Sequence, residues 1–74
     1  MDNDNLIRMA NRIGIFFSAM PERTEALEGI ATHIKRFWAP RMRQQILTHL
    51  DQQGGQGLQD IVLEALQLHA GMLR

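Results

Sequence analysis

The sequence has 74 residues, no cysteine and a formal net charge of zero at neutral pH. The lack of cysteine excludes disulfides, thiolate metal sites and thiol nucleophiles, and the balanced charge argues against a general nucleic-acid binder. No apolar run approaches the roughly 20 residues that span a bilayer, and the acidic start Met-Asp-Asn-Asp-Asn is unlike a signal peptide. We therefore expect a soluble, cytoplasmic protein.

Two helices are predicted in the first half of the chain, at about residues 4–19 and 22–38. In the first, apolar residues recur at helical spacing: Leu6, Met9, Ala10, Ile13, Phe16, Phe17 and Met20. In the second, the apolar stripe comprises Leu27, Ile30, Ala31, Ile34, Phe37 and Trp38. Pro21 ends the first helix and suits the first position of the next. The second helix must stop near Trp38, because Pro40 disfavours helical geometry at the residue before it.

Two further helices are predicted at about 41–52 and 58–70, separated by a Gly/Gln-rich loop at 52–57. We expect the fourth helix to end at Gly71 in a left-handed cap. Its apolar arc, which Leu63 extends, is wider than the ~100° that covers a small core, so we expect it to face both its own bundle and another chain. The predicted fold class is all-α, a compact bundle of three to four short helices that forms a single domain over residues 1–74.

Gly14 and Gly29 interrupt otherwise good helices, where glycine costs up to ~1 kcal/mol relative to alanine. Two explanations are open: close packing of the first helix against the second, or a backbone surface that a partner contacts. We favour close packing, since small side chains let helix axes approach.

The sequence shows no constellation of residues typical of catalysis. The three histidines, His33, His49 and His69, fall on three different predicted helices and lack the spacing of a metal-binding pair. The Gly54–Gly57 stretch follows no strand, so it is more simply a flexible connector than a phosphate-binding loop. We expect no catalytic, cofactor-binding or metal-binding residues in this chain.

Residues 29–50 carry four basic residues and no acid, and they surround a corner at Pro40. One interpretation is a helix-turn-helix nucleic-acid-binding protein. The residues that would address a groove are Arg41, Arg43, Gln44, Gln45 and Thr48. The other interpretation is a protein interface, because tryptophan and arginine are enriched at binding hot spots. We expect Trp38 itself to be a core residue, whereas the arginines are better interface candidates.

Several segments resemble the delta subunit of soluble NAD-dependent formate dehydrogenases. They are Leu-Ile-Arg-Met-Ala-Asn-Arg-Ile at 6–13, Phe16-Phe17, Pro21, Ile-Ala-Thr-His at 30–33 and Phe-Trp-Ala-Pro-Arg-Met-Arg at 37–43. The last of these is the most specific. After Leu50 the resemblance rests on a Gly-rich loop followed by a Leu-rich helix.

The resemblance implies a non-catalytic accessory subunit of a large cytoplasmic complex. In that family the alpha subunit carries a bis-pterin molybdenum or tungsten centre and iron–sulfur clusters, and beta and gamma subunits pass electrons through FMN to NAD. The delta subunit is associated with assembly or stability of the complex, or with insertion of the molybdenum cofactor.

We therefore expect the chain to dock on the alpha subunit. The partner-binding residues that we predict are Arg8, Asn11 and Arg12 from the first helix, and His33, Arg36, Arg41 and Arg43 near the corner. Arginines at these positions can form forked pairs with carboxylates of the partner, or contact phosphates of a cofactor.

Overall fold

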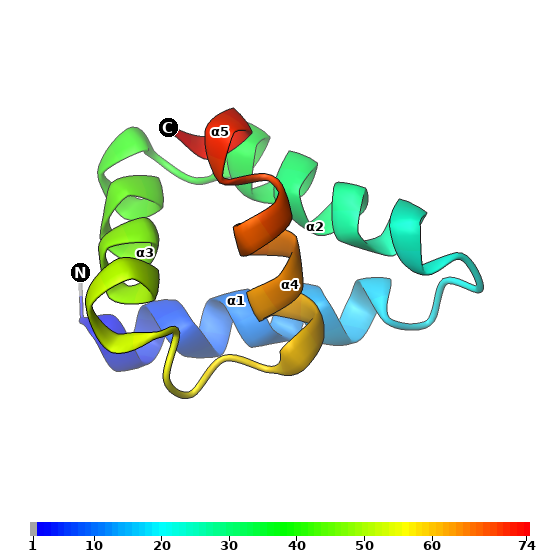
Figure 1. The fold of residues 1–74 in the computed structure, drawn as a ribbon, viewed down its shortest axis with the longest axis horizontal. Helices are drawn as coiled ribbons and strands as arrows, with labels where there is room; N and C mark the ends of the chain where they lie inside the picture. Colours follow the sequence, from blue (N-terminus) through cyan, green and yellow to red (C-terminus); the bar gives the residue numbers. More distant parts are fainter. Residues whose placement is uncertain (1) are drawn as a thin grey trace.

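The computed structural model describes residues 2–74, which form five helices and no strand (Figure 1). The helices are α1 (Asn3–Phe17), α2 (Arg23–Phe37), α3 (Pro40–Gln53), α4 (Asp60–Leu68) and α5 (Ala70–Leu73). The predicted all-α class is confirmed. No helix in this part of the chain is long and apolar enough to cross a membrane.

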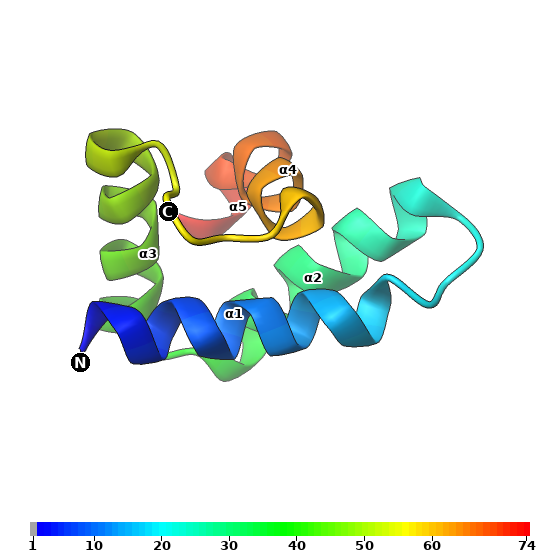
Figure 2. The ribbon, with the colours of Figure 1, turned by 90° about the horizontal axis from the view of Figure 1, so that it is seen from below.

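The first two helices form an antiparallel hairpin, and the other three pack on it (Figures 1 and 2). Asp2 caps α1 by accepting a hydrogen bond from the backbone N–H of Asp4 at 3.2 Å. The turn between α2 and α3 contains only Trp38 and Ala39, both extended, so α3 turns sharply away from α2. It crosses the hairpin where α1 begins and α2 ends, while α4 packs on both hairpin helices (Figure 1).

One apolar core lies between these helices. Its largest fully buried side chains are Leu6, Ile30, Ile34, Ile46, Val62, Leu66 and Leu73. Trp38 joins the same core with 5% of its surface exposed, which confirms its predicted core role.

Close packing explains the two helical glycines. A Cβ atom at Gly14 would overlap the Val62 side chain of α4, and one at Gly29 would overlap the ring of Phe17. The prediction of close packing is therefore confirmed, although Gly14 makes room for α4 rather than for α2.

Two phenylalanines that were assigned to the core stripes lie on the surface instead. Phe16 is 74% exposed and Phe37 is 70% exposed. Phe17 occupies the position against Gly29, and Phe16 lies about 100° further round the helix, where no element covers it. Phe37 is the last residue of α2, and the chain turns away immediately after it.

The predicted fourth helix is two helices separated at His69, which has φ −111° and ψ 22°. Gly71 therefore lies inside α5 and does not have the positive φ of a left-handed cap, so that prediction is wrong. The break turns α5 back over the bundle, where Leu73 is only 2% exposed. A left-handed cap does end α3, at Gly54 with φ 65°.

Leu63, which widens the apolar arc of the fourth helix, packs against the chain's own Gly-rich loop. The Leu50, Leu58 and Leu63 side chains close around Gly55, which is buried with φ 75°. Leu68, at 62% exposed, and Met72, at 37%, are the large apolar residues that remain open in α4 and α5.

Candidate interaction surface

Four rings form a continuous row on one face of the α1–α2 hairpin. Phe16 packs edge-on against Phe17 with ring centroids 5.1 Å apart, Phe17 lies 6.3 Å from His33, and His33 lies 4.8 Å from Phe37. We call this row, together with Ile13, the aromatic face. Both ends of the row, Phe16 and Phe37, are the most exposed large apolar residues in the described part of the chain.

The aromatic face contains a shallow hollow of about 280 Å³. Its lining comes from both hairpin helices: Arg12, Ile13, Phe16 and Phe17 from α1, and His33 from α2. Small-molecule sites usually enclose about 300–1,000 Å³. An open hollow of this size, walled almost entirely by apolar atoms, is better suited to a side chain of another protein.

Basic side chains border this face without ion-pair partners. Arg12 lines the hollow, and Arg36 is exposed on α2 one turn after His33. Among residues 2–74 the ion pair that forms is elsewhere, between Arg23 and Glu64 at 2.6 Å. The guanidinium groups of Arg12 and Arg36 are therefore available to carboxylates of a partner.

The structure brings three of the seven predicted partner-binding residues to the aromatic face: Arg12, His33 and Arg36. Arg8 is exposed one turn before Arg12 and donates a hydrogen bond to Asn5 Oδ1 at 2.9 Å. Arg41 is exposed in the first turn of α3, on the corner rather than on the face.

Asn11 and Arg43, the other two predicted residues, make contacts within the chain. Asn11 donates from Nδ2 to the carbonyl of Gly57 at 3.0 Å and accepts from the N–H of Gln59 at 2.9 Å, which fixes the Gly-rich loop to α1. Arg43 donates to three backbone carbonyls, those of Trp38, Lys35 and Leu73. These contacts give both residues a structural role, and their predicted contact with a partner stays a prediction.

The same contacts bear on the helix-turn-helix hypothesis. Of the five residues predicted to address a groove, Arg43 is turned toward carbonyls of the corner, and Gln45 donates to Asn3 Oδ1 at 2.9 Å. Gln44 and Thr48 bond to each other at 3.4 Å. The start of α3 thus presents Arg41 as its exposed basic side chain, so the corner offers less for groove contacts than the sequence suggested.

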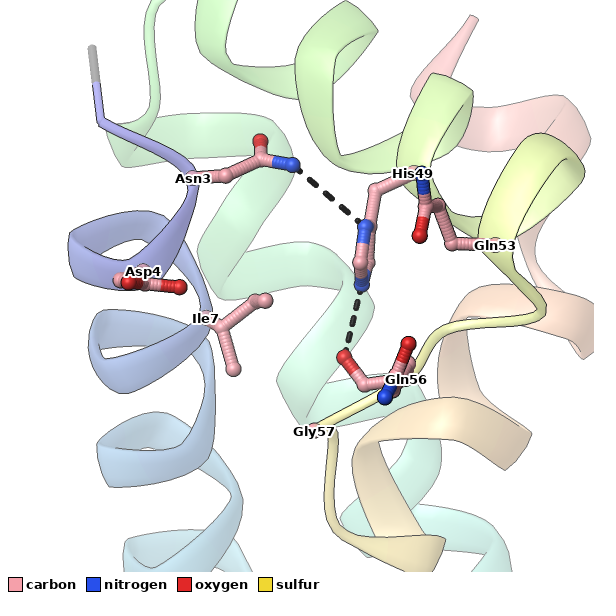
Figure 3. A pocket seen from close by; sticks show the side chains of 7 residues that line it. All are labelled: Asn3, Asp4, Ile7, His49, Gln53, Gln56 and Gly57. Atoms are coloured by element: carbon pink, nitrogen blue, oxygen red, sulfur yellow. Dashed lines mark hydrogen bonds between the residues drawn. The ribbon is translucent and has the colours of Figure 1, made fainter.

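A polar pocket of about 450 Å³ lies at the start of α1, and His49 of α3 forms part of its wall (Figure 3). The Gln56 carbonyl can only accept, so His49 donates to it from Nε2 at 2.8 Å and accepts from Asn3 at Nδ1 at 3.5 Å. His49 thereby joins α1, α3 and the Gly-rich loop. No group of three or more potential metal ligands occurs within residues 2–74.

Sequence reasoning missed Phe16, Phe17, Ile13 and Phe37 as surface candidates, since it counted all four as core. The positions of the aromatic residues in the sequence offered one signal of exposure. Phe16 precedes Phe17 and Phe37 precedes Trp38, and adjacent helical residues point about 100° apart, which made one ring of each pair the candidate for exposure.

Comparison with known protein families settles the class of the chain. The family model of the NADH-dependent formate dehydrogenase delta subunit, FdsD, matches residues 5–66. The chain belongs to this family. The match confirms the resemblance seen in the sequence, and it spans the whole aromatic face and stops before α5. No curated protein and no solved structure matches the chain.

Proposed function

We propose that this formate dehydrogenase delta subunit is a non-catalytic chain that docks on the catalytic alpha subunit through the aromatic face. The observation that carries the proposal is the row of four rings, which ends in two exposed phenylalanines. Burying a phenylalanine side chain contributes about 1.5–3 kcal/mol. Aromatic residues beside arginine are also the composition that concentrates binding energy at interfaces.

The size of the chain supports a role inside a larger assembly. A domain of 74 residues buries only about 60% of the surface of its unfolded chain, so its own stability is small. Because a partner binds only the folded chain, docking raises the free energy of unfolding. The delta subunit is therefore stabilised by the complex and in turn covers a surface of the alpha subunit.

We assign the redox groups to the partners, following the resemblance. The alpha subunit then carries the bis-pterin molybdenum or tungsten centre with iron–sulfur clusters, and the beta and gamma subunits carry the flavin and bind NAD. The delta subunit supports assembly or stability of this cytoplasmic complex, or insertion of the molybdenum cofactor into the alpha subunit.

A native pull-down of the tagged chain from its own host tests the docking proposal. The expected result is recovery of an alpha, beta and gamma assembly that contains molybdenum or tungsten, iron–sulfur clusters and flavin. Recovery of nucleic acid alone, or of no partner, would overturn the proposal.

Deletion of the chain from the host tests the assembly role. We expect less intact complex, and molybdenum analysis of the remaining alpha subunit separates the two forms of the role. A normal metal content with reduced complex indicates structural support, whereas a metal-poor alpha subunit indicates a role in cofactor insertion. Normal yield and normal metal content together would contradict both forms.

A further inference from the structure

We propose that the aromatic face receives an acidic segment of the alpha subunit that inserts one bulky apolar side chain into the hollow beside Arg12. This inference rests on the proposed function and adds the chemistry of the partner segment and its orientation. The segment is amphipathic, with its apolar anchor over the rings and its carboxylates near Arg12 and Arg36.

The anchor follows from the shape and lining of the hollow. Ile13, Phe16, Phe17 and His33 supply its walls, and its volume of about 280 Å³ suits a large aliphatic or aromatic side chain. Phe37 lies next to His33 at 4.8 Å and is exposed like Phe16, so these two rings can contact the flanks of such an anchor. At interface hot spots, a large side chain fills a well-packed pocket from which water is excluded.

The carboxylates follow from the charges around the face. The aromatic face is built from residues of two segments, 5–21 and 29–50, and neither segment contains an acidic residue. Arg8, Lys35 and Arg36 lie in the half of the hairpin away from its turn, and Arg12 lies just past the middle of α1, beside the hollow. Glu22, Glu25 and Glu28 lie in the half that contains the turn. The acidic part of the partner segment therefore extends from the hollow toward the open end of the hairpin, where α2 ends.

The charge of the face distinguishes the partner segment from a second copy of this chain. A symmetric pair sets the same patch of both copies face to face. Such a pair would bring Arg12 and Arg36 of both copies into one contact, and residues 5–21 and 29–50 contain no acid to pair with them. A different chain that carries carboxylates fits this surface better.

Site-specific crosslinking in the intact complex tests the inference. A benzophenone amino acid replaces Phe16, the host complex is irradiated, and the crosslinked peptide is identified by mass spectrometry. The expected peptide comes from the alpha subunit and carries a large apolar residue with Asp or Glu within about one or two helical turns. A peptide without nearby acids, or a crosslink to a second copy of this chain, would overturn the inference.

Charge and ring variants provide the second measurement. The double variants Arg12→Glu/Arg36→Glu and Phe16→Ala/Phe37→Ala should each lower recovery of the alpha subunit by about tenfold or more. Arg74→Glu reverses one charge at an exposed residue outside the face and should retain the complex. Because the four substituted side chains are exposed, circular dichroism should show folded variants.

The outcomes separate the inference from the proposed function. If the unmodified chain recovers no formate dehydrogenase, the docking proposal fails. If the unmodified chain and both double variants recover the complex equally, the chain is a docked subunit, but the aromatic face is not the docking site and this inference fails.

Discussion

Arg43 is predicted to hold the corner between α2 and α3, so its replacement should destabilise the isolated chain. Its guanidinium donates to the Trp38 carbonyl at 2.9 Å, to the Lys35 carbonyl at 3.3 Å and to the Leu73 carbonyl at 3.4 Å. The first two carbonyls belong to the end of α2, where helical partners are missing. The third connects the corner to α5. One side chain thus joins three segments of the fold.

The contacts set the size of the effect. A hydrogen bond to a charged group contributes about 1.5–3 kcal/mol, and only the bond to Trp38 is short. Counting the two longer bonds as weak, Arg43→Met should lower the free energy of unfolding by about 2–3 kcal/mol. In a domain of this size each kcal/mol lowers the melting temperature by about 4–8 °C. The melting temperature should therefore fall by about 8–24 °C.

Thermal unfolding followed by circular dichroism at 222 nm measures this change. Arg41→Met is the matched control, since Arg41 is exposed in the first turn of the same helix. Removing this positive charge from the positive end of the helix dipole should leave the free energy of unfolding unchanged or raise it by about a few tenths of a kcal/mol. If Arg43→Met melts within about 3 °C of the control, Arg43 does not hold the corner.

Three further predictions concern single positions. Gly14→Ala should destabilise the chain although alanine favours helices, because overpacking against Val62 costs about 1–3 kcal/mol. Gly71→Ala is the control, since a Cβ atom there meets nothing within 4 Å, and it should be neutral or stabilising. Equal urea midpoints for the two variants would refute the close contact at Gly14. Trp38→Ala should lower stability by about 3–5 kcal/mol, and an unchanged melting temperature would show that the ring is not buried. Arg41 is exposed on the corner next to the aromatic face, so Arg41→Glu should reduce co-purification of the complex less than Arg12→Glu/Arg36→Glu does, while the isolated chain stays helical; full retention would place Arg41 outside the interface.

The helical architecture could be predicted because its signals are local. Pro40 begins α3, as its fixed backbone geometry favours, and helical spacing located the core positions Leu6, Ile30 and Ile34. Pro21 does not open the second helix as predicted, because it lies in the turn between the end of α1 at Phe17 and Glu22, the N-cap of α2. The break at His69 could not be predicted from such local signals. It depends on α5 folding back so that Leu73 is buried, which is a tertiary preference.

The candidate surface was harder to predict because exposure depends on packing between elements. Helical periodicity assigned Phe16 and Phe37 to core stripes, and only the packed hairpin shows that nothing covers them. Charge was no better a guide. Arg12 and Arg43 look alike in the sequence, yet one borders an open hollow and the other binds carbonyls of its own chain. The same side chain serves different roles according to which backbone groups the fold brings within its reach.

The most direct test of the central claim is a cryo-electron microscopy structure of the formate dehydrogenase complex purified through this chain. The predicted result is a five-helix delta subunit whose α1–α2 aromatic face lies against the alpha subunit, with an apolar side chain in the hollow and carboxylates beside Arg12 and Arg36. A delta subunit bound through another surface, with Phe16 and Phe37 left in solvent, would contradict it.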